Sequence, residues 1–261
     1  MIPKIIHYCW FGGNPKPAIA EKCLASWTKY CPEYEINEWN ENNYDLSQSP
    51  LYVQQAYKAR KWAFVTDYVR LHVVYEHGGI YLDTDVELVQ SPNRFLNYPA
   101  FFGFEGTYSV ATGLGFGAEK KSVILKELMN DYQDIPFILD SGEMDLTPCP
   151  VRNTEVFLTK GLNLDGTRQV LVDGTLILPP EYLCPLDNAT RILHKTKNTI
   201  SIHHFDASWQ SQEQKDAHDR LARQRRLKLF KNEVLYLPKR IMRCIIGDRL
   251  YEKIKKQIKS K

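Results

Sequence analysis

Residues 78–88, with the sequence GGIYLDTDVEL, decide how this chain folds. Apolar and polar residues alternate after the two glycines, which is typical of a half-buried β-strand. Side chains two residues apart in a strand point to the same side, roughly 6–7 Å apart along the chain. We therefore expect Asp83 and Asp85 on one face of a strand, and Ile80 and Leu82 on the other face, in a core.

The segments around residues 78–88 predict strands and helices in alternation. Before residue 78, the expected elements are a strand at 4–11, a helix at 17–30, a strand at 34–39 and a helical stretch, in one or two helices, at 51–77. This β-α-β-α-β order indicates an α/β sheet with helices packed on it. After residue 88 we expect a helix at 123–132 and strands at 100–104, 114–117, 175–178 and 199–204.

Composition excludes several classes of protein. Of the 261 residues, 43% are apolar, 12% aromatic and 25% charged, which is too apolar for a disordered chain. No apolar run approaches the ~18 residues of a membrane span, and the first residues lack the apolar stretch of a secretory signal. The six cysteines form no CxxC pair and are expected as free thiols. These features predict a cytoplasmic protein.

Asp83 and Asp85 are the first candidates for chemistry. Two carboxylates at the end of a buried strand form half of a site for a hard divalent cation, which can neutralise a departing diphosphate; two solvated acids are the alternative.

In the helical stretch before them, Asp67 and Arg70 are neighbours at i,i+3. Arg70 can meet a phosphate or a sugar hydroxyl, oriented by Asp67; a surface salt bridge is the alternative.

The pair His203-His204 follows the last expected strand, shortly before Ser208 and Trp209. Imidazole complements carboxylates around manganese-like ions, and Ser and Trp can donate hydrogen bonds to phosphate oxygens. Without an acidic pair, a structural role for such histidines is more common. At the other end of the chain, Tyr8 and Trp10 follow the first strand, where their rings could stack on a nucleobase or fill the core.

Four segments together resemble a known family. They are IPKIIHYCW at 2–10, Ala63-x-x-Thr66-Asp67-x-x-Arg70, GGIYLDTD at 78–85, and His203-His204-x-x-x-Ser208-Trp209. In this order they resemble glycosyltransferase family 32, which includes transferases of capsular polysaccharide and lipopolysaccharide synthesis and initiating mannosyltransferases. The resemblance covers residues 1–90 and 199–209 closely, and the middle of the chain weakly.

This resemblance implies a fold and a reaction. The expected fold is of the GT-A type, an α/β nucleotide-sugar-binding sheet with helices on both faces. The expected reaction moves a sugar from a nucleotide-sugar donor to a glycan or lipid-linked acceptor, with retention of anomeric configuration and with a divalent cation, Mn²⁺ or else Mg²⁺. A role in the synthesis of capsule or lipopolysaccharide follows from the same resemblance.

The resemblance also implies roles for single residues. The catalytic set is Asp83, Asp85 and Arg70. The metal ligands are Asp85, Asp83 and one or both of His203 and His204. The donor is expected to contact Tyr8, Trp10, Asp67, Arg70, Tyr81, Asp83, Ser208 and Trp209. Residues 152–159 lack the Gly-Pro element that is usual in the family, so the sequence leaves the sugar-binding wall unassigned.

Charge divides the chain into an acidic body and a basic tail. Residues 1–219 hold 19 Lys and Arg against 28 Asp and Glu, and residues 220–261 hold 15 against 3. We expect a GT-A-like catalytic domain at 1–210 and a basic helical extension at 211–261. From Pro238 onward, apolar residues near i,i+4 spacing among Lys and Arg predict an amphipathic helix, or two helices broken at Gly247.

Such a helix suits the anionic cytoplasmic leaflet, where each Lys or Arg contributes about 1 kcal/mol. The protein is then expected to lie peripherally on the cytoplasmic face of the membrane. A helix packed on the domain with a solvated charged face is the alternative. The acidic body argues against nucleic acid as a partner.

Two other functions remain open at this stage. A haloacid-dehalogenase-type phosphatase would use Asp83 as its nucleophile and Asp85 as its acid or base. The residues that follow fit that class poorly, because Glu87 comes after Val86 and the later Asp248 stands alone in a basic segment. A non-catalytic glycan-binding module would bind sugar without metal.

Overall fold

The computed structural model describes residues 1–206 and 212–246, and within 233–246 it describes the backbone alone. The chain forms two compact units. The first contains residues 1–187 and 193–209, and the second contains residues 188–192 and 210–261.

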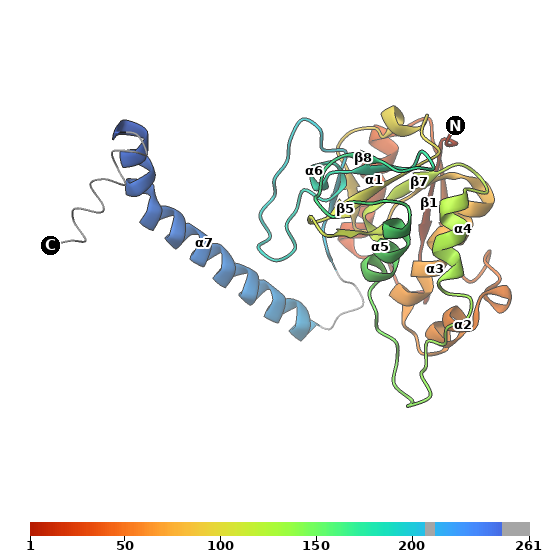
Figure 1. The fold of residues 1–261 in the computed structure, drawn as a ribbon. Coiled ribbons are helices and arrows are strands. Elements are labelled where there is room, and N and C mark those ends of the chain that lie inside the picture. Colours follow the sequence, from red (N-terminus) through yellow and green to blue (C-terminus); the bar gives the residue numbers. More distant parts are fainter. Residues whose placement is uncertain (207–211, 247–261) are drawn as a thin grey trace. The chain divides into compact units, whose positions relative to one another are not determined.

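The first unit is built around a mixed β-sheet (Figure 1). Its strands, in spatial order, are β2 (Glu35–Trp39), β1 (Ile5–Cys9), β3 (Gly79–Tyr81), β7 (Phe116–Ala118), β5 (Ala100–Glu105), β9 (Leu176–Leu178) and β8 (Gln169–Val170), and β6 (Ser109–Val110) pairs with β5. β1 is parallel to β2 and β3, and β5 is parallel to β9, whereas β7 and β8 are antiparallel to their neighbours. In a separate two-stranded sheet, β4 (Val86–Leu88) pairs antiparallel with β10 (Ser201–His203).

Helices cover both faces of the sheet. One face packs on α1 (Ala18–Tyr30) and α6 (Pro180–Leu183), and the other on α2 (Leu51–Lys58), α3 (Trp62–His77), α4 (Val123–Asn130) and α5 (Cys149–Thr159). Short 3₁₀ turns lie at η1 (Leu46–Gln48), η2 (Asn93–Phe95) and η3 (Thr112–Leu114). Successive strand residues point into opposite cores, so Phe101 packs on the α1 side and Phe102 on the α3 side. The predicted α/β fold with helices on both faces is confirmed.

The strand predicted over residues 80–88 is interrupted, and here the prediction is wrong. β3 ends at Tyr81, and β4 begins at Val86 in the second sheet. A turn joins them, in which the Val86 N–H donates to Asp83 O at 2.9 Å. Asp83 and Asp85 therefore project from a turn between two sheets. The apolar pattern could not reveal the break, because a single core buries Ile80, Leu82, Val86 and Leu88.

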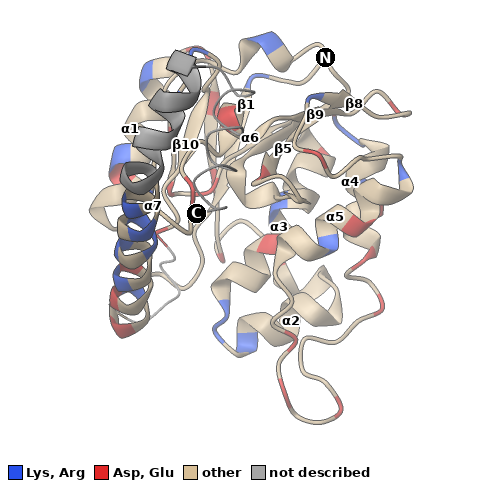
Figure 2. Cartoon of the chain, turned by 60° about the vertical axis from the view of Figure 1, so that its left-hand side comes forward, with Lys and Arg blue, Asp and Glu red and all other residues tan. Residues whose placement is uncertain are grey.

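The second unit contains α7 (Gln212–Ile246), a helix of 35 residues. From residue 220 to residue 231 its Lys and Arg side chains are exposed. Figure 2 marks in blue where Lys and Arg fall along the helix. Between them, Leu221 is 50%, Leu227 60% and Phe230 64% exposed. The backbone beyond Pro238 is helical up to Ile246, and the predicted break at Gly247 lies outside the described residues. Across 1–206 and 212–246, no helix combines the length and the apolar character needed to cross a bilayer.

Candidate active site

Two glycines and a buried histidine seat β3 against β1. Gly78 and Gly79 have φ of 70° and 112°, and a Cβ on Gly79 would lie 2.7 Å from Ile5 O and 3.0 Å from His7 Nε2. His7 Nδ1 accepts a hydrogen bond from Trp39 Nε1 at 3.0 Å, so Nε2 carries the ring proton and donates it to Gly78 O at 2.8 Å. Burial lowers the pKa of His7 to about 4, which keeps the ring neutral. This packing fixes the start of β3 beside β1, a few residues before the acidic turn.

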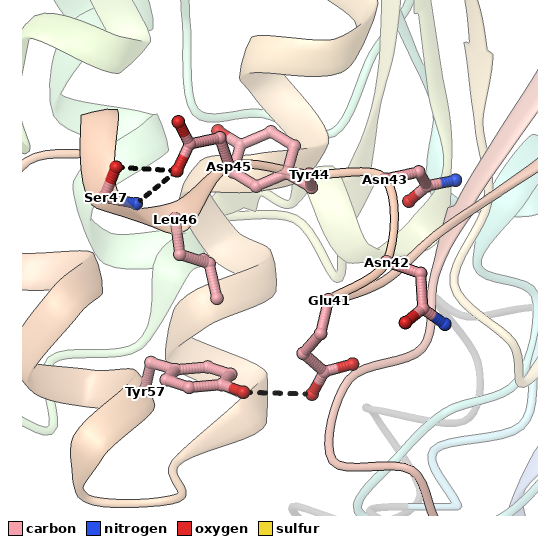
Figure 3. A pocket seen from close by; sticks show the side chains of 8 residues that line it. All are labelled: Glu41, Asn42, Asn43, Tyr44, Asp45, Leu46, Ser47 and Tyr57. Carbon is pink, nitrogen blue, oxygen red and sulfur yellow. Dashed lines mark hydrogen bonds between the residues drawn. The ribbon is translucent and has the colours of Figure 1, made fainter.

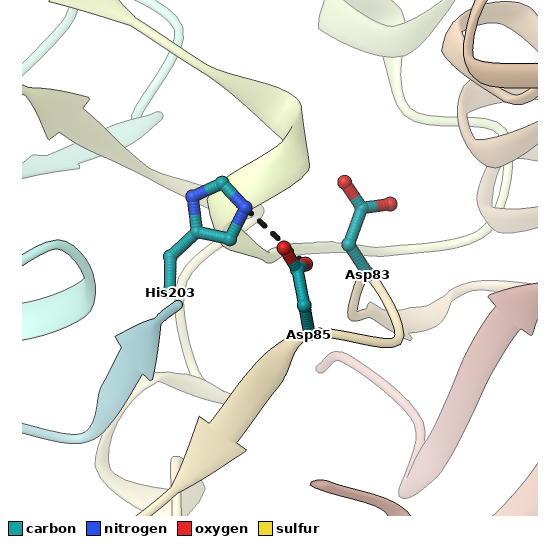
Figure 4. A group of neighbouring side chains, drawn as sticks. All are labelled: Asp83, Asp85 and His203. Carbon is teal, nitrogen blue, oxygen red and sulfur yellow. Dashed lines mark ion pairs between the residues drawn. The ribbon is translucent and has the colours of Figure 1, made fainter. Parts of the chain in front are cut away.

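The acidic turn and β10 bring three candidate ligands together (Figure 4). One ligand atom from each of Asp83, Asp85 and His203 lies within 4.8 Å of the others. His203 Nε2 is 3.3 Å from Asp85 Oδ1, and the backbone N–H of Asp206 donates to Asp85 Oδ2 at 2.9 Å. The three side chains are 25%, 17% and 13% exposed, so the group is partly open to solvent.

Arg70 joins the acidic turn to α3. Its Nη2 lies 3.3 Å from Asp83 Oδ1 and 3.2 Å from Asp67 Oδ1, and its side chain is 4% exposed. The Arg70 Cζ lies 5.2 Å from the centre of the Tyr81 ring, whose hydroxyl donates to Asp83 Oδ1 at 2.8 Å. A Cβ on Gly113 would lie 2.8 Å from Asp83 Oδ2 and 3.2 Å from Arg70 Nη1. The Asp67–Arg70 pair is therefore buried, and the alternative of a surface salt bridge is wrong.

Thr112 and Cys149, for which the sequence predicted no role, also contact Arg70. Its Nη1 lies 3.5 Å from Thr112 Oγ1 in η3 and 3.8 Å from Cys149 Sγ at the start of α5. Thr112 Oγ1 donates in turn to Asn153 Oδ1 at 3.0 Å. The segment at 152–159, which the sequence left unassigned, thus reaches the site through Asn153. The sequence did not predict this contact, because residues 152–159 lack the Gly-Pro element and carry no other motif.

Burial and neighbouring charges separate the pKa values of the three acids. Burial would raise the pKa of Asp85, but the charge and hydrogen bond of His203 and the Asp206 N–H lower it to about 2. Burial raises the pKa of Asp67 to about 6, and it raises the pKa of Asp83 as well, in both cases against the opposing effect of Arg70. Burial would lower the pKa of His203, but the facing Asp85 raises it. Asp85 and His203 therefore form an ion pair whenever the His203 ring is protonated.

This donor set fits a divalent cation. Two carboxylates and one imidazole suit Mn²⁺, and Mg²⁺ can take the same carboxylates with water as its remaining ligands. Ligation through His203 requires loss of the ring proton that faces Asp85. His204 is held elsewhere, with Nε2 2.8 Å from Glu87 Oε2, which also pairs with Lys22. Of the two predicted histidines, His203 is the one that lies with the acids.

The predicted aromatic contacts lie at the end of β1. Tyr8 is buried edge-on against Trp27, with ring centroids 5.5 Å apart, and its hydroxyl bonds to Glu38. Trp10 is half-buried, and its Nε1 donates to Asn14 O at 2.6 Å. Packing accounts for the position of Tyr8, whereas Trp10 keeps part of its ring exposed. The predicted Ser208 and Trp209 lie outside the described residues.

A polar hollow of about 570 Å³ follows the end of β2 (Figure 3). It is lined by Glu41, Asn42, Asn43, Tyr44, Asp45, Leu46, Ser47 and Tyr57. Glu41 Oε1 accepts a hydrogen bond from Gly12 N at 2.6 Å, which ties the hollow to the loop after β1. Because β1, β2 and β3 are parallel, these loops and the acidic turn lie at the same edge of the sheet. No sequence motif marked this hollow.

The fold and the site define an α/β protein with a group of two acids and a histidine, a candidate cation site, at the carboxyl edge of its sheet. Residues 17–102 match the family model described as a glycosyltransferase sugar-binding region containing the DXD motif. This region runs from α1 through the turn that carries Asp83 and Asp85. This match, over 86 of the 261 residues, confirms the predicted resemblance to the DXD-motif glycosyltransferases.

Two kinds of known protein are similar to this chain. Inositol phosphoceramide mannosyltransferase 3 of Schizosaccharomyces pombe is 32% identical over 108 residues, which cover 38% of this chain and 29% of that protein. The match thus spans less than a third of the relative's length. Among solved structures, PaToxG glycosyltransferase has a TM-score of 0.48 at 18% identity, over 60% of this chain and 68% of its own. A glycosyltransferase involved in glycosylation of the major capsid of PBCV-1 has a TM-score of 0.42 at 13% identity, over 83% and 98%.

Proposed function

We propose that this chain is a divalent-cation-dependent glycosyltransferase that moves a sugar from a nucleotide-sugar donor to a hydroxyl of a glycan or glycolipid acceptor. The observation that carries the proposal is the convergence of Asp83, Asp85 and His203 within 4.8 Å, with both acids inside the region that matches the family model. Residues 1–210 would form the catalytic domain, and Asp83, Asp85 and Arg70 its catalytic set.

The three ligands would hold Mn²⁺, or Mg²⁺ in its place. When bound, the cation supplies positive charge against the two phosphoryl groups of the departing nucleoside diphosphate. Arg70 lies between Asp67 and Asp83 and fixes both acids before the donor arrives, so little reorganisation is needed when the donor sugar binds. At the same edge of the sheet, Trp10 would offer its ring face to the nucleoside, and the polar hollow after β2 would offer hydrogen-bond partners.

We propose retention of the anomeric configuration. The acceptor hydroxyl would attack from the face on which the nucleoside diphosphate leaves. The bond from the anomeric carbon to the acceptor oxygen forms as the bond to the phosphate oxygen breaks, and the hydroxyl proton passes to the departing phosphate. The anomeric proton signal of the new glycosidic bond, measured by NMR, tests this directly.

The activity is tested with UDP- and GDP-sugars, with and without Mn²⁺. We expect one donor to raise the melting temperature only with Mn²⁺, because a ligand that binds the native state stabilises it by mass action. The same donor should be hydrolysed slowly without an acceptor, and Asp85→Asn should lose this hydrolysis with its melting temperature kept. Near-normal hydrolysis in Asp85→Asn contradicts the proposed cation site.

The acceptor is proposed to be a lipid-linked glycan of surface polysaccharide synthesis, with α7 on the anionic cytoplasmic face of the membrane. Exposed basic side chains and exposed Leu221, Leu227 and Phe230 favour this. Vesicles with and without phosphatidylserine test it, by co-sedimentation with the full chain. Arg220, Arg223 and Arg226 changed together to Glu should abolish binding, whereas Lys29, Lys58 and Lys61 changed to Glu should not. Equal binding of both triple variants refutes the membrane role.

Simple assays separate this proposal from its alternatives. A phosphatase would hydrolyse para-nitrophenyl phosphate, and a glycan-binding module would bind sugar without Mn²⁺ and leave nucleotide sugars intact. A phosphatase nucleophile must be free to attack phosphorus. Asp83 is instead hydrogen-bonded by Tyr81 and paired with Arg70, which favours the transferase.

A further inference from the structure

Phe205 has a backbone conformation that aromatic residues rarely adopt. Its φ is 52°, in the left-handed region that favours glycine. It follows His203-His204 directly, at the point where β10 has ended. Strained residues of this kind persist only where the surrounding structure holds them, and they cluster at functional sites.

The reversal at Phe205 lets neighbouring residues wrap around Asp85. Before it, His203 Nε2 lies 3.3 Å from Asp85 Oδ1, and the His204 N–H donates to Asp85 O at 3.0 Å. After it, the Asp206 N–H donates to Asp85 Oδ2 at 2.9 Å. With an ordinary extended φ at Phe205, the next N–H would continue along the line of β10. The left-handed conformation therefore turns the backbone of Asp206 toward the carboxylate.

The ring of Phe205 makes a second contact at the site. Its centroid lies 4.2 Å from that of the His203 imidazole, with 49° between the planes. It also packs against the core on the α1 side of the sheet. His203 Nδ1 is buried, and among the described residues it has no hydrogen-bond partner. A metal-binding histidine usually has its ring fixed by a hydrogen bond from the second nitrogen. Here the contact with the Phe205 ring fixes the orientation of the imidazole instead of such a hydrogen bond.

We propose that Phe205 is a positioning residue for the cation site. Its backbone aims the Asp206 N–H at Asp85, and its ring holds the His203 imidazole toward the two acids. The inference rests on the proposed function insofar as the site binds a cation. Glycine would adopt this φ without strain but would leave His203 unsupported, which accounts for an aromatic residue at this position.

Variants of Phe205 separate the backbone from the ring. Phe205→Gly keeps the left-handed conformation and removes the ring, and Phe205→Tyr keeps the ring. Arg60→Gly is the matched control, because Arg60 has φ of 56° in the connection between α2 and α3. We expect Phe205→Gly to remain folded, with a lower melting temperature because the ring no longer packs on the core, and to bind Mn²⁺ about 10-fold more weakly. Phe205→Tyr and Arg60→Gly should bind Mn²⁺ as the wild type does. Free Mn²⁺ is measured by electron paramagnetic resonance, without donor.

Wild-type affinity in Phe205→Gly overturns the inference. Equal losses in Phe205→Gly and Phe205→Tyr also overturn it, because the ring would then not be responsible. If the wild type binds no Mn²⁺, the proposed function fails, and crystal structures of the metal-free wild type and Phe205→Gly decide the inference. A His203 ring displaced from Asp85 in the variant supports it, and an unmoved ring overturns it.

Discussion

Arg70 Nη2 lies 3.3 Å from Asp83 Oδ1, and this contact ties α3 to the acidic turn. Because Arg70 is buried, its removal leaves the carboxylates of Asp83 and Asp67 without their counter-charge. We expect Arg70→Met to lower the free energy of unfolding by about 3–5 kcal/mol and to abolish transfer. Arg70→Lys should also lose transfer, because an ammonium group cannot bridge both acids as the guanidinium does. Urea unfolding and nucleotide-sugar turnover measure the two effects.

The control for Arg70 is the exposed pair between Lys22 and Glu87, 2.7 Å apart. Lys22→Met should cost less than about 1 kcal/mol, as is usual for surface pairs. If Arg70→Met unfolds at the same urea concentration as Lys22→Met, the Arg70 contacts do not stabilise the fold.

Gly113 leaves the space that Asp83 and Arg70 occupy. The added methyl of Gly113→Ala would lie 2.8 Å from Asp83 Oδ2, so the carboxylate must shift. We expect at least a 10-fold loss of turnover and of Mn²⁺ affinity, with about 1–3 kcal/mol of destabilisation from overpacking. Gly103→Ala is the matched control, because its methyl would lie 2.9 Å from Leu183 Cδ1 in the core. Gly103→Ala should lose similar stability and keep its Mn²⁺ affinity. If Gly103→Ala instead binds Mn²⁺ more weakly than Gly113→Ala, Gly113 does not matter for the site.

Asp67 makes stability depend on pH. Its pKa in the folded protein is about 6, above its ordinary value of 3.8, because it is buried. The folded state thus binds the proton more tightly than the unfolded state, and stability falls as pH rises from about 4 to 6. The loss is on the order of 3 kcal/mol. The Asp67→Asn variant cannot titrate at this position, so its melting temperature should be higher than that of the wild type at pH 7.5. At pH 4 the two melting temperatures should differ much less.

Melting temperatures between pH 4 and pH 8 check this, with Asp140→Asn at an exposed position as control. Parallel curves for Asp67→Asn and wild type would mean that Asp67 does not titrate in this range. Asp67→Asn should nevertheless lose turnover, because its carboxylate is proposed to face the donor sugar.

The two adjacent histidines should differ sharply in their effect on the cation. His203 lies with the acids, whereas His204 bonds to Glu87. We expect His203→Gln to weaken Mn²⁺ binding by at least 10-fold and His204→Gln to leave it within about 2-fold. Removal of the ion with EDTA should stop donor hydrolysis in the wild type, and added Mn²⁺ should restore it. Equal weakening in both variants would argue against His203 as the ligand.

Much of the fold was predictable because local patterns determine it. The helical spacing of residues 17–30 and the strand pattern of 34–39 reappear as α1 and β2. The relation of Asp67 to Arg70 follows from i,i+3 geometry alone, which depends on no tertiary contact. The family motifs also led to Asp83, Asp85 and His203 as neighbours.

Other parts of the site arise from tertiary structure and have no local signal. Thr112 and Cys149 contact Arg70 from segments without periodic pattern, and only packing brings them there. The break after Tyr81 depends on which sheet Val86 joins. Phe205 runs against the preference of aromatic residues for negative φ, so propensity would have placed its neighbour Asp206 away from Asp85.

The proposed cation ligands are far apart in the sequence, since the acidic turn follows β3 and His203 lies at the end of β10, the last strand among the described residues. Domains begin to fold during synthesis from the N-terminal side. A nascent chain on the ribosome can pair β1, β2 and β3 long before His203 and Asp206 are translated. Asp85 then lacks the partners that lower its pKa, and the growing polypeptide has no complete site. The proposed cation site therefore becomes complete only after residue 206 has been translated.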